Sequence, residues 1–333
     1  MRGKIKTRLA VLLAVITLLT LLVGCGPNED ADVNDDEVKM PELITIGASE
    51  PGSSWYPMAV AMKDVLEKEY EDMQVEIFYG GGDINLKAIE EGKIDFGITF
   101  GVTAYDSLEG RNRFDEPLEN VRGALGIFLA NLQMVTRPDS DIKSVADLKG
   151  KTISTGMPGY ATTGMFPDVL KVHGVDADDV TFEFATMPDV AVMFKDKSID
   201  LFAVHSTIEN PFPIIQDITA NTPIRLLSIS EEDLEELNKI NPGHLKVTIP
   251  GGLYRGQDED VVSQGNVAML ATRADLPDEV VYNVIKTLIE NSDELANIVS
   301  DLKYINAENG PVGLAIPLHP GAEQYYEEQG TLK

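Results

Sequence analysis

Four segments rich in glycine and hydroxyl side chains are the parts of this sequence best suited to bind a small molecule. Each follows a short apolar run, and they lie at residues 48–57, 80–83, 99–105 and 156–164. Glycine lets the backbone come close to a ligand, and Ser or Thr can cap a helix while offering a hydroxyl group. One such segment is typical of an ordinary turn, but four of them in one chain favour a small-molecule cleft.

The candidate ligand-binding residues lie in these segments, just after them, or after one later apolar run. They are Ser49, Ser53, Trp55, Tyr56, Asn85, Gly101, Tyr105, Gly156, Thr162, Thr163, His205 and Asn210. Trp55 could pack on a ligand or equally hold its helix on the core, and a lone histidine such as His205 is as often structural. Tyr105 could reach the cleft with its hydroxyl group or face solvent.

The charge of the ligand is indicated by the same segments. N–H groups at helix starts near Ser53 and Thr162 would suit an anion or a zwitterion. Many carboxylate receptors also use an arginine that grips both oxygens. The arginines weighed for this role are all typical of surface or loop positions: Arg122, Arg137, Arg225, Arg255 and Arg273. We therefore expect N–H and hydroxyl groups to hold most of the ligand.

Patterns that would indicate an enzyme do not occur in the sequence. The four histidines have no metal-ligand spacing, and there is no G-x-S-x-G, P-loop or dinucleotide fingerprint. The single cysteine, Cys25, excludes an internal disulfide framework and a CxxC site. We expect a binding protein with no catalytic residue, no metal and no cofactor.

Short apolar runs alternate with amphipathic stretches along the chain, which predicts an α/β fold with parallel strands and helices on both faces. Ligands in such folds bind beyond the carboxyl ends of the strands. Strands are predicted at 43–47, 74–79, 94–100, 121–128, 132–136, 152–155, 181–184, 199–204, 224–229 and 267–272. Helices are predicted at 56–70, 84–91, 162–173, 188–197 and 278–290.

The N-terminus has the layout of a secretory signal. Four basic residues lie within 1–8, and an apolar run follows at 9–23. The run ends in Leu-Val-Gly before Cys25, which resembles the lipobox of bacterial lipoproteins; the alternative is an ordinary signal peptide or membrane anchor with an incidental cysteine. We expect a signal peptide at 1–24, lipidation of Cys25, and an acidic tether at 25–42.

The charge balance is strongly acidic, with 27 basic and 55 acidic side chains and a net charge of −28. Such a chain repels nucleic acid and anionic membrane surfaces, so neither is expected as a partner. The acids are spread along the sequence, which favours a role in solubility over a dedicated docking patch.

Several longer motifs, in order, resemble the TAXI family of TRAP-transporter receptors. Residues 44–57 resemble its opening, where a Gly/Ser-rich loop precedes an aromatic residue, Tyr and Pro. Further matches are GGGDINLKAIEEGKIDFG at 80–97, DSDIKSVADLKGKTISTGMPG at 139–159, IPGGLYRGQDED at 249–260, LATRADLPDEVV at 270–281, IPLHPG at 316–321, and Tyr325-Tyr326. The resemblance runs from about residue 43 to 330.

This resemblance implies a two-lobed type II periplasmic-binding-protein fold with a ligand cleft between the lobes. Lobe one would be 43–130 plus 267–333 and lobe two 131–265, with crossings near 129–136 and 264–270. The receptor would capture a small organic acid or amino acid, such as glutamate, and deliver it to TRAP permease subunits. It would be exported and lipid-anchored, facing the periplasm or the cell exterior. The alternative is the solute-binding protein of an ABC importer, which shares the fold.

Overall fold

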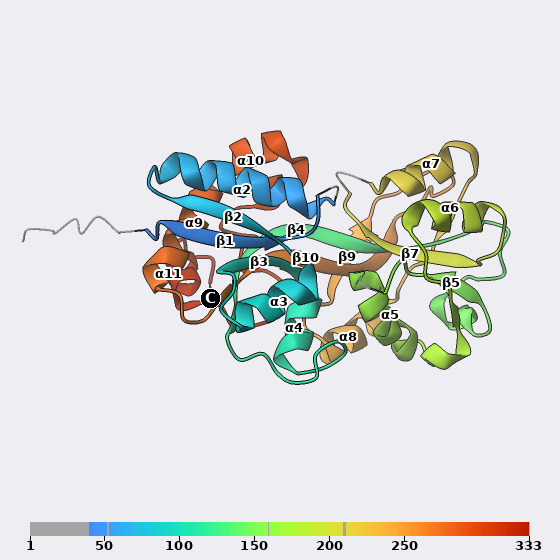
Figure 1. The fold of residues 1–333 in the computed structure, drawn as a ribbon. Helices are drawn as coiled ribbons and strands as arrows, with labels where there is room; N and C mark the ends of the chain where they lie inside the picture. The colour runs from blue at the N-terminus through green and yellow to red at the C-terminus, as the bar shows by residue number, and fades with distance from the viewer. Residues whose placement is uncertain (1–39, 52, 159, 209–210, 333) are drawn as a thin grey trace, which may run out of the picture. The chain divides into compact units, whose positions relative to one another are not determined.

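The computed structural model describes residues 40–51, 53–158, 160–208 and 211–332 (Figure 1). The predicted signal peptide, Cys25 and most of the acidic tether lie outside the described residues, as does the candidate ligand residue Asn210. Among the described residues, no helix has the length and apolar character needed to cross a membrane. Residues 40–333 form one compact unit.

One mixed sheet runs through the described residues, with ten strands. Eight of them follow the order β2-β1-β3-β10-β4-β7-β5-β6, while β8 pairs with β4 and β9 with β10. The strands are β1 (Leu43–Ala48), β2 (Gln74–Tyr79), β3 (Phe96–Phe100), β4 (Val121–Thr136), β5 (Thr152–Ser154), β6 (Thr181–Phe182), β7 (Leu201–Ser206), β8 (Arg225–Leu226), β9 (Leu245–Ile249) and β10 (Val261–Arg273).

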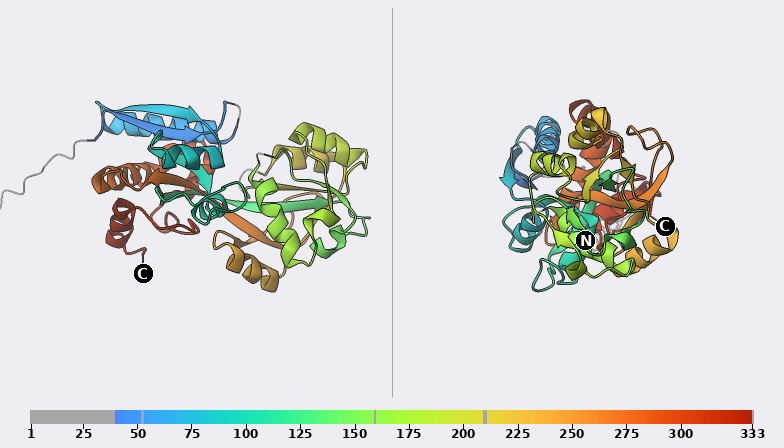
Figure 2. Two further views of the ribbon diagram at one scale, coloured as in Figure 1. Left: turned by 60° about the horizontal axis from the view of Figure 1, so that its bottom comes forward. Right: turned by 90° about the vertical axis from the view of Figure 1, so that its right-hand side faces the viewer.

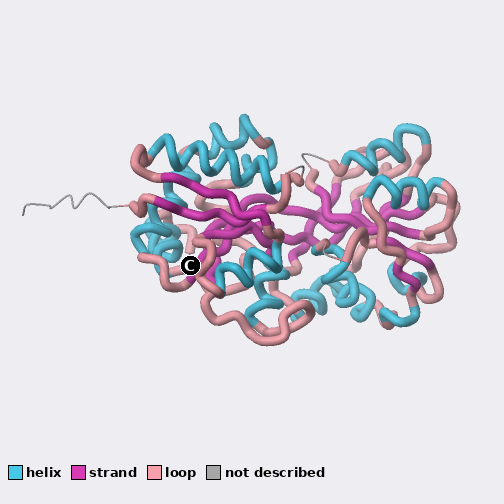
Figure 3. The backbone as a smooth tube through the Cα atoms, viewed as in Figure 1, coloured by secondary structure: helices cyan, strands magenta, loops and turns pink. Residues whose placement is uncertain are grey.

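Helices cover both faces of the sheet, as predicted (Figure 3). They are α2 (Trp55–Glu69), α3 (Gly82–Glu90), α4 (Gly101–Leu108), α5 (Ala161–Val172), α6 (Met187–Lys195), α7 (Pro213–Asn221), α8 (Glu231–Ile240), α9 (Asp278–Glu290), α10 (Ser292–Ile298) and α11 (Pro320–Glu328). Short 3-10 helices lie at Val145–Leu148, Ala177–Asp179 and Ser300–Tyr304. The predicted α/β class is therefore confirmed in its elements.

Two parts of the strand prediction are wrong. The runs 121–128 and 132–136 belong to one strand, β4, because the residues between them stay extended and pair with β10. The sheet is also not wholly parallel, since β10 runs antiparallel to both β3 and β4. Buried polar Asn131 interrupts the apolar run of β4, so the sequence pattern divides the strand, and apolar periodicity does not give the direction of a strand.

The directions of the strands determine where their ends meet. β1, β2 and β3 are parallel to one another, and both β3 and β4 oppose β10, so β1–β3 run in the direction of β4. β7 opposes β4, and β5 and β6 run with β7. The carboxyl ends of β1–β3 therefore face the carboxyl ends of β5–β7. We call the region where they meet the seam.

The register gives the width of the seam. At the end of β3, Phe100 lies opposite Ala268, which lies opposite Phe128. At the end of β7, Ser206 lies opposite Asn131. Phe128 and Asn131 are three residues apart on one strand, or about 10 Å. Figure 2 shows β4 and β10 running without interruption between the helices on the two sides of the seam.

The buried apolar side chains form four clusters that follow the same division. Two clusters come from residues 44–130 and 267–326, on the side of α2, α3, α9 and α11. The other two come from residues 132–261, on the side of α5–α8, together with Val102 from α4. Each side of the seam thus has its own apolar core.

Candidate ligand-binding site

Aromatic rings from both sides meet at the seam. Phe100, the last residue of β3, stacks on the imidazole of His205 in β7, with ring centroids 5.6 Å apart and planes at 29°. Trp55, the first residue of α2, meets Phe100 edge-on at 5.3 Å, and Phe128 of β4 does so at 6.1 Å. The ring cluster Trp55, Phe100, Phe128 and His205 therefore joins three strands and a helix start.

His205 is held by a chain of neutral hydrogen bonds. Its Nδ1 lies 2.9 Å from Thr162 Oγ1, and its Nε2 lies 3.2 Å from Gln264 Oε1. The amide nitrogen of Gln264 donates to the carbonyl of Gly265, so its oxygen is the atom that faces the ring. Nε2–H then donates to Gln264, and Nδ1 accepts from Thr162. Burial lowers the pKa of His205 to about 4, against the raising effect of Gln264, which keeps the ring neutral.

A polar network centred on Arg111 also crosses the seam. Its guanidinium group contacts Asp106 of α4 at 2.9 Å and Asp168 of α5 at 2.6 Å, and it donates to the carbonyl of Ile240 at 3.0 Å. Asn241 donates to Asp106 at 3.0 Å. Burial raises the pKa of Asp106, while Arg111 and Asn241 act to lower it. This Arg111 network ties α4 to α5 and to the end of α8.

Arg113 links two of the four segments that the sequence singles out. It contacts Asp83 at 3.3 Å and donates to the carbonyl of Tyr160 at 2.8 Å. It also lies across the first turn of α5, because a Cβ on Gly164 would come within 2.7 Å of Nη2. Sequence reasoning missed Arg111 and Arg113. The signal available in the sequence was the pair of turn-forming residues Gly110 and Asn112 beside these arginines. Both residues have positive φ in the structure.

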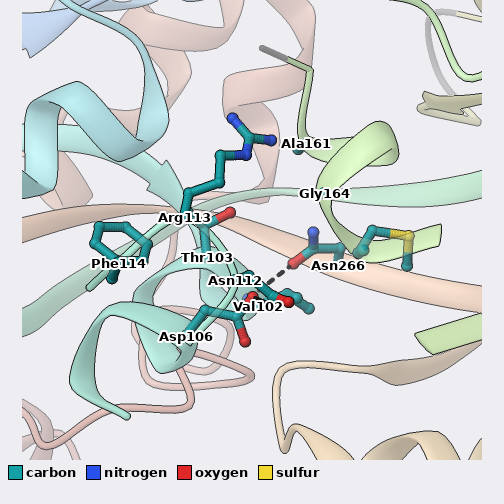
Figure 4. A pocket seen from close by; sticks show the side chains of 10 residues that line it. Val102, Thr103, Asp106, Asn112, Arg113, Phe114, Ala161, Gly164 and Asn266 are labelled. Carbon is teal, nitrogen blue, oxygen red and sulfur yellow. Dashed lines mark hydrogen bonds between the residues drawn. The ribbon is translucent and has the colours of Figure 1, made fainter. Parts of the chain in front are cut away.

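Two pockets have residues of the ring cluster, or residues next to it in the chain, in their linings. Pocket A, of about 20 Å³, is lined by residues of α4, the turn after it, the start of α5, and β10: Val102, Thr103, Asp106, Asn112, Arg113, Phe114, Ala161, Gly164, Met165 and Asn266 (Figure 4). Pocket B, of about 240 Å³, is lined by Phe128, Leu129, Asn131, Thr207, Ile208, Val247, Asp301, Lys303, Tyr304 and Asn309. Pocket A adjoins Phe100 through α4, and pocket B contains its neighbour Phe128.

Of the predicted ligand residues, the structure brings Trp55, Thr162 and His205 to the ring cluster or into contact with it. Gly101, directly after Phe100, packs where a Cβ would collide with the carbonyl of Gly313. None of the predicted residues is among those that line pocket A or pocket B.

Other predicted residues stabilise the segments themselves. Asn85 is fully buried and donates to the carbonyls of Ala48 and Ile98, at 3.2 and 2.8 Å. It therefore holds β1 and β3 together.

Ser53 accepts from the backbone N–H of Tyr56 at 3.4 Å, and Tyr56 packs on Tyr79. Thr163 donates within its own loop, and Gly156 has a φ of 87°. Ser49 and Tyr105 are half-buried, after β1 and on α4. A contact of these residues with a ligand stays a prediction.

The neutral state of His205 predicts a pH dependence of stability. The unfolded chain binds a proton on His205 below about pH 6.5, whereas the folded protein does so only near pH 4. The free energy of unfolding should therefore fall as pH drops from 6.5 to 4, by up to about 1.4 kcal/mol per unit from this residue. His205→Gln should make the fall shallower, as urea denaturation at each pH would show. Parallel curves for the two proteins would contradict a neutral His205. The pKa of His244 is lowered to about 3 by burial, His205 and Arg111, so His244 adds to the fall in both proteins.

Comparison with known proteins relates this geometry to a family and to solved structures. XAC2383 of Xanthomonas citri, bound to ATP, is similar with a TM-score of 0.54 at 12% identity, over 86% of this chain and 95% of that one. The alkanesulfonate-binding protein SsuA of Xanthomonas axonopodis pv. citri, bound to MOPS, gives 0.46 at 17% identity, over 87% and 84%. A binding protein component of an ABC phosphonate transporter of Pseudomonas aeruginosa gives 0.46 at 16% identity, over 80% and 81%.

The likeness to XAC2383 is one of fold, and it covers most of both chains. These comparisons do not test the resemblance to TAXI receptors, so membership of that family stays a prediction. The model of one family matches residues 46–330, which is most of the sequence. The chain belongs to the NMT1-like family.

Proposed function

We propose that this protein is an exported receptor that binds a small solute at the seam and delivers it to a membrane transporter. The observation that carries the proposal is the facing arrangement of the two sets of strands, β1–β3 and β5–β7. We propose that the two sides are lobes, formed by 43–130 plus 267–333 and by 131–265. β4 and β10 would be the crossing segments between them.

Helix starts from both sides support solute binding there. α2, α3 and α4 begin just after β1, β2 and β3, and α5 begins after β5. Each start presents N–H groups that its own helix does not use, and these favour polar or anionic ligand groups. His205 and Arg111 at the seam are held by hydrogen bonds and ion pairs, and we assign no catalytic role to either.

The contacts across the seam are of a kind that can open. They are ring contacts, a neutral hydrogen-bond chain and the Arg111 network, while the apolar clusters stay mainly within each side. Separation would therefore expose polar groups to water without unfolding either core. We propose that the lobes close on the solute by bending of β4 and β10.

The class of solute that we propose is a small organic acid or amino acid. Arg111 and Arg113 bring guanidinium groups to the seam, where they contact Asp83, Asp106 and Asp168, and donors of this kind also suit the carboxylate of a solute. The similar structures were described with ligands as different as ATP and MOPS, so the fold alone does not select the solute.

The membrane partner has two candidates. The motifs resemble those of TRAP receptors, whereas the similar structures include components of ABC transporters, so the comparisons favour the ABC importer. Uptake of radiolabelled solute by cells or by proteoliposomes with the neighbouring permease separates the two. Uptake that stops with vanadate and survives a collapsed sodium gradient would support an ABC importer, and the reverse pattern a TRAP carrier.

Lipid anchoring at Cys25 is part of the proposal, although this residue lies outside the described structure. Two acyl chains on one cysteine would give stable membrane attachment. Metabolic labelling with a palmitate analogue tests it: the wild-type protein should be labelled and Cys25→Ser should not. A wild-type protein that takes up no label would refute the anchor.

Solute binding should be visible through Trp55, the single tryptophan, because it lies on Phe100 at the seam. In a screen of amino acids, keto acids and dicarboxylates, a true solute at 100 times its Kd should stabilise the protein by about 2.7 kcal/mol and change the Trp55 emission. Arg111→Gln should weaken that solute about tenfold, because closure loses its contacts to Asp168 and Ile240.

Arg255→Gln is the matched control, since Arg255 is exposed and its guanidinium group donates to the nearby carbonyl of Ala220. Its affinity for the solute should equal that of the wild type. A solute that stabilises the protein without any change in Trp55 emission, and with equal affinity in Arg111→Gln, would place binding away from the seam.

A further inference from the structure

The side-chain amide of Asn266 presents a donor without an acceptor. Asn266 lies on β10 and is fully buried. Its Oδ1 accepts from the backbone N–H of Val102, the second residue of α4, at 3.3 Å. Because an N–H group can only donate, the oxygen must face Val102, and Nδ2 must point away from it. Within the described residues, Nδ2 has no hydrogen-bond partner.

Pocket A is the space in which an acceptor for Asn266 Nδ2 could lie. Figure 4 shows Asn266, Thr103 and Arg113 among the side chains around the pocket, with Asn266 bonded to Val102 at its base. A volume of about 20 Å³ admits one group the size of an oxygen atom. A buried amide donor left unpaired costs about 1–3 kcal/mol, so an acceptor is expected in this space.

Apart from Asp106, the polar side chains named in the lining of pocket A can donate hydrogen bonds. Asp106 also lines it, but its carboxylate is already bonded by Arg111, Asn112 and Asn241. Arg111 also contacts Asp168, so the network holds two carboxylates and one guanidinium group, and Asn112 and Asn241 supply neutral donors. The hydroxyl of Thr103 and the guanidinium of Arg113, which also contacts Asp83, are donors beside the amide of Asn266.

Both helix starts beside the pocket add to this polarity. Val102 and Thr103 belong to the first turn of α4, and Ala161 and Gly164 to the first turn of α5. Helix N-termini carry a partial positive charge that stabilises anions nearby. Hydrogen bonds to a charged acceptor are also roughly twice as strong as those to a neutral one. The pocket therefore suits a carboxylate oxygen better than an amide or alcohol oxygen.

We propose that pocket A is the subsite for a carboxylate of the solute, with Asn266 Nδ2 and Arg113 as its principal donors. This inference rests on the proposed receptor function and assigns the carboxylate of the proposed acid or amino acid to pocket A. One carboxylate oxygen occupies the pocket, and the remainder of the solute extends into the seam. Arg113 keeps its contact with Tyr160, so the bound carboxylate also bridges the start of α5 to α4.

Acetate and acetamide test the subsite, because they are nearly equal in size and differ in charge. Each is titrated against the full-length protein at constant ionic strength, and the apparent Kd is taken from the shift in unfolding temperature. Acetate should bind at least tenfold more tightly than acetamide. Asn266→Asp, which replaces the donor with a second acceptor, should weaken acetate at least tenfold, as should Arg113→Gln. Arg255→Gln should leave it unchanged.

The subsite is refuted if acetate and acetamide bind equally, or if both variants retain wild-type affinity for acetate. A crystal structure determined in the presence of acetate, with only water at Asn266 Nδ2, would also refute the subsite. Arg113 is partly exposed, so its replacement keeps the test decisive even where Asn266→Asp fails to fold. If the subsite fails while a solute still changes the emission of Trp55, the receptor function stands and only the carboxylate assignment is lost.

Discussion

The antiparallel pairing of β4 with β10 is the constraint on which the rest of the structure depends. Residues 121–131 pair with 265–273 on one side of the seam, and the same strands continue to β7 and β9 on the other. Because β3 and β7 oppose β10 and β4 respectively, the parallel strands on each side must end toward the seam. The helix starts, the glycine-rich loops and the ring cluster follow from that one arrangement, which places loops distant in sequence around a common space.

The chemistry of the seam combines neutral groups at its centre with charges around them. His205 is kept neutral by burial and by bonds to Thr162 and Gln264, so it can stack on Phe100 without a buried charge. Arg111 is compensated by Asp106 and Asp168, and Arg113 lies nearer the surface beside Asp83. Because three carboxylates contact these two arginines, their guanidinium groups would act on an anionic solute as hydrogen-bond donors and not through a net positive charge.

Much of the fold could be predicted from the sequence, because most strands and helices have clear periodicity and capping or glycine-rich ends. The α/β class and the placing of Thr162 and Trp55 near strand ends came from these local patterns. Asn85 shows where local patterns stop: its segment suggested a ligand contact, but the packing of β1 against β3 turns it inward. Arg111, Arg113 and Asn266 were missed, because only the register of β10 and the turn after α4 bring them to the seam.

Distance between the two sides, with and without solute, tests the central claim most directly. Spin labels on Ile84→Cys of α3 and Lys171→Cys of α5, in a Cys25→Ser background, would report it by pulsed electron resonance. Both positions are exposed, and they lie on opposite sides of the seam. The account predicts a shorter and narrower distance distribution when a solute from the binding screen is present. An unchanged distribution with saturating solute would show that binding does not close the two sides, and would contradict it.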